Sequence, residues 1–312
     1  MNLYLKWKEA LKKKLFARST IVDTRKGPVE YAIDGDSGPY VMVIHGGPGG
    51  YDQTSALFSD MLDKGFRILS WSRPGYLRTP LDNGATFTEQ ADLAAALIDS
   101  LGIDRVAVLG YSAGGPSAVY FSVRYPDRIW ALILECAVTR RWRISPDNIE
   151  ERIYFGWLMY DDAFLWTADA AAHIAPRLIG MSTIEMESSL DLEEQIRLIH
   201  DIMKDKRRIN VLKNLMKSMS PAELRKDGMK NDIAQLRRIK DLPMNGIKAP
   251  TLIIHGTDDA DVSVRDAQLA AERIPQSELY LVPGGFHVLA LADSIDQITE
   301  KRISFLQRNS PG

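Results

Sequence analysis

A serine stands at residue 112 in the stretch GYSAGG, between an apolar run at 105–109 and a predicted helix at 113–124. Gly110 and Gly114 lie two positions before and after it, which gives the spacing G-x-S-x-G. Small residues at these positions allow a sharp strand-to-helix turn that exposes the serine side chain. The N-terminus of the following helix carries partial positive charge, which favours an anion developing at the serine. We interpret Ser112 as a candidate nucleophile, with a serine in an ordinary tight turn as the alternative.

A glycine-rich loop, HGGPGG at 45–50, follows an apolar predicted strand. Backbone N–H groups in such a loop can approach a ligand closely because glycine has no side chain. Two donors aimed at one point stabilise the oxyanion of acyl transfer, and losing one typically costs about 2.7–4 kcal/mol. We expect the N–H groups of Gly47 and Ala113 to be these donors, and Gly46 and Tyr111 to contact the substrate. A phosphate-binding loop is disfavoured because no G-K-[ST] follows the glycines.

A serine nucleophile needs a base, and the sequence offers five histidines. His45 and His255 each stand at the end of a predicted strand. His173 and His200 lie in a helical region, where a surface or packing role is expected. His287 lies in VPGGFHVL, after the last predicted strand, in a loop that can carry the imidazole over the carboxyl ends of the strands. His287 is therefore the predicted general base.

The base needs an acid to orient it, and four residues are candidates. Asp258, Asp259 and Asp261 follow a predicted strand in HGTDDADV, and Glu135 ends another predicted strand. The order serine, acid, histidine along the chain is the order found in α/β-hydrolases.

Strand and helix signals alternate in two parts of the chain, 19–139 and 246–312. Because the strands read as continuous apolar runs, this alternation predicts a mostly parallel sheet with helices on both faces, in one core domain. The predicted strands are 29–34, 40–45, 66–71, 105–109, 129–135, 250–255 and 278–282, and the predicted helices between or after them are 88–101, 113–124, 263–273 and 289–307.

The segment 140–245 interrupts this alternation with helical patterns. It holds eight of the eleven methionines and three of the six tryptophans. Methionine fills irregular apolar space, so these residues suit an adaptable lid over a substrate pocket. Ordinary helical core is the alternative, and it is favoured for most of them. We predict a helical lid inserted into the core domain.

The bulk properties are those of an ordinary globular chain, with 312 residues, 45% hydrophobic and 26% charged residues, and a formal net charge of −2. A nucleic-acid partner is disfavoured because such proteins usually carry a clustered basic excess. Cys136 is the single cysteine. We expect it to be a buried apolar residue, and a reducing cytoplasm fits this cysteine count. The sequence has no apolar run long enough to cross a membrane, and its N-terminus lacks the apolar centre of a signal peptide.

Residues 1–18 predict a separate amphipathic basic helix. Apolar residues recur every four positions at Leu3, Trp7, Leu11 and Leu15, and lysines fill the other faces. Attachment to an anionic membrane surface is one interpretation. Packing on the protein's own body or on a second subunit is favoured, because amphipathic helices usually face protein. The sequence does not predict an oligomeric state.

These motifs together resemble the α/β-hydrolase superfamily from about residue 28 to the end. They are HGGPGG, WSRPGYLRT, GYSAGG, HGTDDADV and GGFH, in this order and at suitable spacing. The resemblance implies an α/β-hydrolase fold in which 140–245 is the lid, and chemistry without a metal or organic cofactor. In relatives the acid follows the pattern G-x-x-D-x-x-V. Gly256, Asp259 and Val262 match this pattern, so the resemblance implies Asp259 as the acid.

The segments HGGPGG and SRPGY also resemble the subgroup that contains proline iminopeptidases and related esterases. Iminopeptidases usually carry GGSWG around the nucleophile, whereas this chain has GYSAG, which disfavours proline-specific cleavage. Epoxide hydrolases and haloalkane dehalogenases place an aspartate at the position of Ser112, so both reactions are disfavoured.

The sequence thus predicts a serine hydrolase that cleaves carboxylic esters of small or medium apolar substrates through an acyl-enzyme. One alternative is an aminopeptidase, which would need acidic lid residues to hold a substrate ammonium. A carbon–carbon bond hydrolase and a ligand-binding homologue without turnover are the others. The acidic lid residues are Glu150, Glu151, Asp161, Asp162, Glu185 and Glu187.

Overall fold

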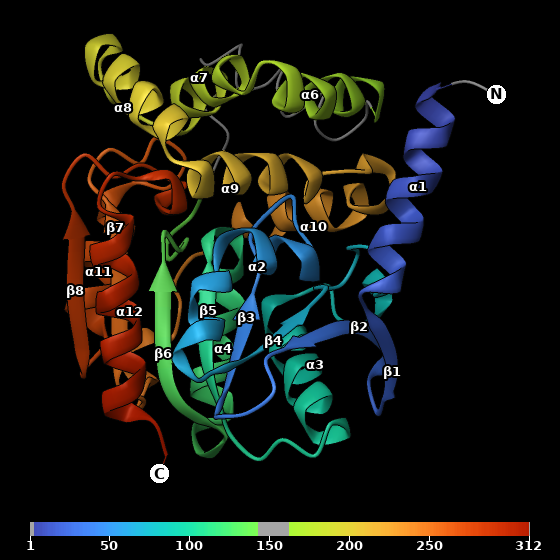
Figure 1. Cartoon of the computed structure of the whole chain (residues 1–312). Helices are drawn as coiled ribbons and strands as arrows, with labels where there is room; N and C mark the ends of the chain where they lie inside the picture. The colour runs from blue at the N-terminus through green and yellow to red at the C-terminus, as the bar shows by residue number, and fades with distance from the viewer. Residues whose placement is uncertain (1–2, 143–161, 312) are drawn as a thin grey trace.

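A single sheet of eight strands runs through the computed structural model, which describes residues 3–142 and 162–311 (Figure 1). The strand order is β1-β2-β4-β3-β5-β6-β7-β8. The pairs β1–β2 and β2–β4 are antiparallel and the other pairs are parallel, as the sequence predicts for most of the sheet. The strands are β1 (Thr20–Thr24), β2 (Gly27–Asp34), β3 (Tyr40–Ile44), β4 (Arg67–Trp71), β5 (Val106–Tyr111), β6 (Ile129–Glu135), β7 (Thr251–Gly256) and β8 (Ser277–Val282).

The central strands are apolar on both faces because helices cover both. In β3, Met42 and Ile44 enter the apolar core on one face, and Val41 and Val43 enter the core on the other. The edge strand β1 was absent from the sequence prediction. Its residues are exposed or half-buried, so it lacks the apolar run that marks the central strands.

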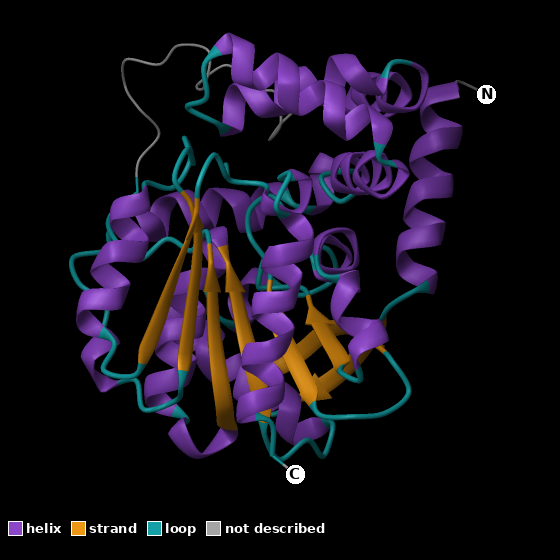
Figure 2. Ribbon diagram, turned by 60° about the vertical axis from the view of Figure 1, so that its left-hand side comes forward, coloured by secondary structure: helices purple, strands orange, loops and turns teal. Residues whose placement is uncertain are grey.

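Helices pack against each face of the sheet (Figure 2). Apolar residues of α3, α4 and α11 contribute to one core, and those of α2 and α12 to the other. Residues 289–291 form a separate 3-10 turn, so the last helix begins later than the sequence predicts. The helices are α2 (Tyr51–Leu57), α3 (Phe87–Ser100), α4 (Gly115–Arg124), α11 (Val264–Arg273) and α12 (Ile295–Asn309).

A layer of further helices, five of them in the part of the chain that the structure describes, lies over the end of the sheet toward which β6 and β8 point (Figure 1). We call these helices, α6 to α10, the helical layer. Ile199 and Leu212 of this layer share an apolar core with the strands, so the layer packs directly on the sheet domain. The helices are α6 (Asp162–Ile174), α7 (Pro176–Glu187), α8 (Leu192–Lys204), α9 (Lys206–Lys217) and α10 (Lys226–Leu236). The lid residues Glu150, Glu151, Trp157, Met159 and Asp161 lie outside the described residues.

The N-terminal helix α1 (Leu3–Ala17) stands beside the helical layer (Figure 1). The Trp7 indole N–H donates to the Asp169 carboxylate over 2.9 Å. The Lys8 ammonium binds the carboxylates of Asp162 and Glu223 over 2.6 and 2.5 Å. The helix therefore packs on the protein's own body in this structure, the arrangement that the sequence analysis favoured. Within the described residues, no helix combines the length and apolar character that a membrane crossing requires.

Candidate active site

Ser112 occupies a sharp turn between β5 and α4. The backbone φ of Ser112 is +50°, in the left-handed region. Residues other than glycine rarely adopt this conformation. A side chain at Gly110 would lie 2.6 Å from Ala118 Cβ, and one at Gly114 would lie 2.7 Å from the backbone oxygen of His45. The two glycines that define the sequence motif are thus required because the turn packs too closely for any Cβ.

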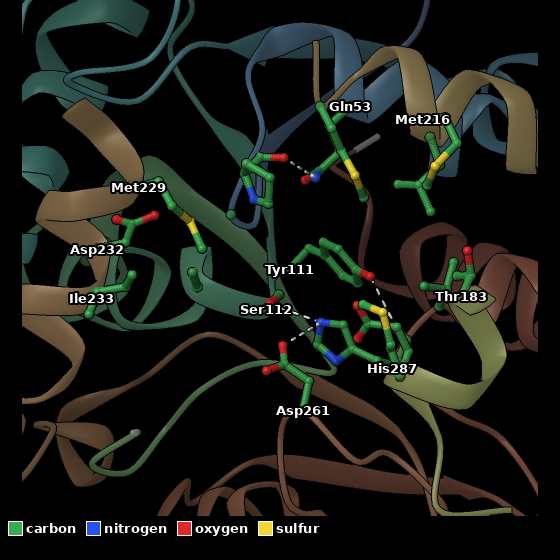
Figure 3. Close-up of a pocket in the computed structure, with 18 of the residues that line it drawn as sticks. Gln53, Tyr111, Ser112, Thr183, Met216, Met229, Asp232, Ile233, Asp261 and His287 are labelled. Carbon is green, nitrogen blue, oxygen red and sulfur yellow. Dashed lines mark hydrogen bonds and ion pairs between the residues drawn. The ribbon is translucent and has the colours of Figure 1, made fainter. Parts of the chain in front are cut away.

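Three predicted residues meet at this turn. The Ser112 hydroxyl lies 3.0 Å from Nε2 of His287, and Nδ1 of His287 lies 2.9 Å from Oδ2 of Asp259. The other oxygen of Asp259 accepts the backbone N–H groups of Asp261 and Val262 over 3.0 and 2.8 Å. Residues 147 positions apart along the chain (112 and 259) therefore lie in one hydrogen-bonded series. Figure 3 shows the part of this series formed by Ser112 and His287.

The other acid candidates have different partners. Glu135 is buried against the guanidinium of Arg302, at 2.9 Å. Asp258 accepts the hydroxyl of its neighbour Thr257 over 2.6 Å. Asp261 is closer to the histidine, since its Oδ2 lies 3.4 Å from Nε2 of His287, on the side of the ring that faces Ser112.

The charges around His287 favour its protonated form. Burial by itself lowers the pKa of His287, but the carboxylates of Asp259 and Asp261 outweigh burial and raise this pKa to about 10. Burial also raises the pKa of the Asp261 carboxyl, while the charge on His287 opposes that rise. The imidazole and these acids therefore form one coupled group beside the serine.

His255 lies behind this group and is fully buried. Its Nε2 lies 2.8 Å from the backbone oxygen of Val262 and 3.3 Å from Oδ2 of Asp259. Burial lowers the pKa of His255. A neutral His255 that donates to Val262 helps to fix the loop carrying Asp259.

The glycine loop forms the wall of the site beside Ser112. Gly47 and Ala113, the predicted oxyanion donors, both line the cavity there. Gly46 does not line it; a side chain at Gly46 would lie 2.9 Å from Ser112 Cβ, so this glycine permits close packing under the serine. Gln53 holds the loop, because its Oε1 accepts the Gly46 N–H over 2.8 Å and its Nε2 donates to the backbone oxygen of Pro48 over 3.2 Å.

A buried arginine from the segment SRPGY ties this loop to the helical layer. Arg73 Nε donates to the backbone oxygen of His45 over 2.9 Å. The same guanidinium makes a two-point ion pair with Asp232 of α10, at 2.7 and 2.5 Å. The hydroxyl of Tyr76 donates to that carboxylate over 2.5 Å. Because Asp232 lines the cavity, the pair joins the layer to the loop next to Ser112.

Arg225 makes a second tie between the layer and the loop. It precedes α10 and donates to the backbone oxygen of Gly49 over 2.5 Å. It also pairs with Asp52 of α2 at 2.8 Å. Burial raises the pKa of the Asp52 carboxyl, and the charge of Arg225 opposes that effect. The glycine loop is therefore held from the helical layer at two points.

A mainly apolar cavity of about 120 Å³ lies between Ser112 and the helical layer (Figure 3). Tyr111 lines it and donates its hydroxyl to the backbone oxygen of His287 over 3.2 Å. Four of the methionines predicted for the lid face this cavity, which favours the adaptable-pocket interpretation for these four. They are Met186, Met216, Met219 and Met229.

Within residues 3–142 and 162–311, two groups of side chains have donor atoms close enough to hold a metal ion. Cys136, His255 and Asp259 form one, and Glu187, Asp261 and His287 form the other. Burial raises the pKa of the Cys136 thiol, which keeps it in the protonated form that binds metals poorly. The first group is therefore best explained as packing around Asp259, whereas the second faces the cavity.

Sequence reasoning missed the residues that hold the site from a distance. The segment containing Arg73 was recognised as a motif, but nothing local to Asp232 or Arg225 marks them as partners of the glycine loop. Gln53 likewise lies between the predicted strands 40–45 and 66–71, where the sequence analysis predicted no helix and the structure has α2. The closeness of Asp261 to the imidazole depends on the course of its loop in three dimensions.

The chain matches the family model described as "alpha/beta hydrolase fold" over residues 39–293. It belongs to the α/β-hydrolase fold family. Within this family it is 26% identical over 286 residues to the uncharacterized hydrolase YcgS of Bacillus subtilis, covering 90% of this chain and 95% of YcgS.

Two further proteins extend the comparison. The structure of an alpha/beta hydrolase fold protein from Nakamurella multipartita is similar with a TM-score of 0.84 and 34% identity, covering 93% of this chain and 99% of that one. A 2-hydroxy-6-oxononadienedioate/2-hydroxy-6-oxononatrienedioate hydrolase from Comamonas testosteroni is 24% identical over 277 residues, or 85% of this chain and 88% of that enzyme.

Proposed function

We propose that this α/β-hydrolase cleaves carboxylic esters of small or medium apolar substrates through an acyl-enzyme on Ser112. The observation that carries the proposal is the unbroken series from the Ser112 hydroxyl through His287 to Asp259, with distances of 3.0 and 2.9 Å. The Ser112 and His287 end of this series lines a cavity that is mainly apolar. A nucleophile, its base and an orienting acid in this geometry are suited to acyl transfer.

In the proposed first step, Ser112 attacks the ester carbonyl and His287 takes its proton. Asp259 holds the imidazole in the required tautomer and stabilises the imidazolium. The backbone N–H groups of Gly47 and Ala113 stabilise the oxyanion. The imidazolium protonates the leaving alcohol, which leaves an acyl-Ser112 ester.

In the second step, water attacks the acyl group while His287 acts again as the base. The new oxyanion uses the same two backbone donors. Its collapse releases the carboxylic acid and returns the proton to Ser112. These steps require no metal or organic cofactor. The mainly apolar lining contributed by the helical layer supports an apolar substrate portion.

Hydrolysis of a carbon–carbon bond next to a ketone is the second candidate. The named substrate of the Comamonas testosteroni relative is a keto acid with two carboxylates, and the same three side chains can serve such a reaction. The mainly apolar lining of the cavity supports the ester instead.

The test is covalent labelling with a fluorophosphonate, read by intact mass, together with hydrolysis of 4-nitrophenyl butanoate. We expect one adduct and turnover in the parent protein, and neither in Ser112→Ala. Ser117→Ala is the matched control, since Ser117 is buried on α4 with its hydroxyl on Gln90 at 2.7 Å, away from the cavity. An adduct that persists in Ser112→Ala, or a folded parent without adduct and turnover, contradicts the proposal.

A further inference from the structure

The leaving oxygen of an ester has one required position in this site. In the proposed first step His287 protonates it, so this oxygen must come within hydrogen-bond reach of Nε2 of His287. The same nitrogen lies 3.0 Å from the Ser112 hydroxyl. A group that the alcohol carries next to its ester oxygen therefore lies beside this end of the imidazole.

The Asp261 carboxylate lies at that end of the imidazole. Its Oδ2 is 3.4 Å from Nε2 of His287 (Figure 3). The backbone of Asp261 is fixed, because its N–H donates to Asp259 over 3.0 Å and its oxygen accepts the indole N–H of Trp142 over 2.9 Å. The side chain lines the cavity and is 23% exposed, so a group on the substrate can reach it.

The charges around Asp261 leave it able to accept a hydrogen bond. Burial lowers the pKa of His287, but the carboxylates of Asp259, Asp261 and Glu187 outweigh burial, so the imidazole is protonated at neutral pH. A carboxylate has about four acceptor positions, so the ion pair with this imidazolium leaves others for a substrate group. A hydroxyl is neutral, so its binding requires an acceptor within reach and does not require an excess of negative charge.

A vicinal diol has the spacing that the two protein atoms require. In a staggered conformation, the two oxygens of such a diol lie about 3 Å apart. The separation of Nε2 of His287 from Oδ2 of Asp261 is similar, at 3.4 Å. With its ester oxygen at Nε2, the alcohol portion can donate its second hydroxyl to Asp261 in a charge-assisted hydrogen bond.

The lining of the cavity differs on the two sides of the nucleophile. Ile233 and Asp232 lie on one side, whereas Thr183 lies on the other side with His287 (Figure 3). The Asp232 carboxylate is held in its ion pair with Arg73. The Thr183 hydroxyl donates within its own helix over 2.9 Å, so its oxygen can still accept a hydrogen bond. The side on which the leaving alcohol must lie therefore suits a polar group.

We propose that Asp261 selects the leaving group, and that the preferred substrates are esters in which one hydroxyl of a vicinal diol is acylated. The inference rests on the proposed ester hydrolysis at Ser112. Asp261 accepts the second hydroxyl, which places the ester oxygen at Nε2 of His287. When the bond between the acyl carbon and this oxygen breaks, the proton of the imidazolium goes to the ester oxygen. The second hydroxyl keeps its own proton, and the intact diol leaves.

The experiment compares 2-hydroxyethyl butanoate with 2-methoxyethyl butanoate, which lacks the donor. 4-Nitrophenyl butanoate is the reference for basal turnover. Both alkyl esters have similar leaving groups and form the same butanoyl-Ser112, so a difference in kcat/KM reports on the alcohol during acylation. We expect kcat/KM to be about tenfold higher for the hydroxyethyl ester, which is the effect of one hydrogen bond to a charged group.

Two variants assign this preference to Asp261. In Asp261→Leu, which removes the acceptor and keeps a side chain of similar size, we expect the kcat/KM ratio of hydroxyethyl to methoxyethyl ester to fall toward one. A purely structural role, or crowding by the methoxy group, leaves the ratio unchanged. The ratio is also insensitive to the altered basicity of His287, because both esters use the same base. Asp258→Leu is the control and should keep the parent ratio, since this aspartate belongs to the same loop but does not line the cavity.

A second measurement follows the same contact in the reverse direction. With 4-nitrophenyl butanoate as the acyl donor, ethylene glycol or 2-methoxyethanol competes with water for butanoyl-Ser112, and the ester products are quantified. We expect ethylene glycol to capture more butanoyl groups than the factor of two that its two equivalent hydroxyls provide. In Asp261→Leu, we expect this further advantage to be lost.

Each outcome bears on a definite claim. Turnover of the esters with a ratio near one in the parent overturns the diol selection and leaves ester hydrolysis standing; this comparison needs no variant. A ratio that stays high in Asp261→Leu also overturns it. A preference that is lost with EDTA and restored by ZnCl2 assigns Asp261 to a metal ion and overturns the direct hydrogen bond. Failure of every ester, the reference included, overturns the proposed function and this inference with it.

Discussion

The buried pair of Arg73 and Asp232 allows the tie between helical layer and glycine loop to be tested quantitatively. Asp232→Leu removes the acceptor of two guanidinium hydrogen bonds and of the Tyr76 hydroxyl. It leaves Arg73, whose side chain is 0% exposed, without a counter-charge. Breaking a buried ion pair from one side typically costs about 3–5 kcal/mol. We expect the free energy of unfolding in urea to fall by about that amount.

Removing both charges separates stability from catalysis. Apolar replacement of both partners removes the unpaired charge, so we expect Arg73→Met with Asp232→Leu to recover part of the stability that Asp232→Leu loses. The buried Tyr76 hydroxyl and His45 backbone oxygen still lose their partners, so some loss relative to the parent remains. This double variant still lacks the donor to the backbone oxygen of His45 that fixes the start of the loop. We therefore expect kcat for 4-nitrophenyl butanoate to fall about tenfold or more, since misplacing oxyanion donors is costly.

An exposed ion pair serves as the control. Arg207 and Asp296 form a pair at 3.1 Å with side chains 69% and 79% exposed, so Asp296→Asn should change the unfolding free energy by less than about 1 kcal/mol. If Asp232→Leu is as stable as the parent, or the double variant is as unstable as the single one, the electrostatic argument is refuted. A double variant with full kcat refutes the positioning argument alone.

Two further predictions concern the base and the serine turn. Because the pKa of His287 is raised to about 10 and only the neutral imidazole accepts a proton, kcat/KM should rise with pH throughout the neutral range. The check is a pH profile of kcat/KM after the background hydrolysis measured with Ser112→Ala has been subtracted. A plateau reached near pH 7 would contradict the prediction. Gly114→Ala should destabilise the protein by about 1–3 kcal/mol in urea unfolding, because its Cβ would lie 2.7 Å from the backbone oxygen of His45. Gly246→Ala, whose nearest contact would be Val123 at 3.3 Å, should remain close to the parent; equal losses in both variants would reject the packing explanation.

Much of the site was predictable because its signals are local. The turn at Ser112 requires glycines two positions away on either side, so the spacing of these glycines in the sequence is enough to predict the turn. The glycine loop and the loop of His287 follow apolar runs that the structure shows as β3 and β8. The choice among the acids of HGTDDADV was not local. Asp259 and Asp261 are two residues apart, yet one lies at Nδ1 of the imidazole and the other near Nε2.

The sequence by itself determined the α/β order of strands and helices, the turn that exposes Ser112, and the order of the residues that meet there. Periodicity and glycine spacing act over a few residues, and these features depend on such short-range constraints. Only the tertiary structure decided that Arg73 reaches Asp232 and that Glu187 lies beside Asp261. These pairs form because α7 and α10 pack over the loops of the sheet. Such packing is set by surfaces that no local pattern encodes, and it gives the cavity its shape and its charge.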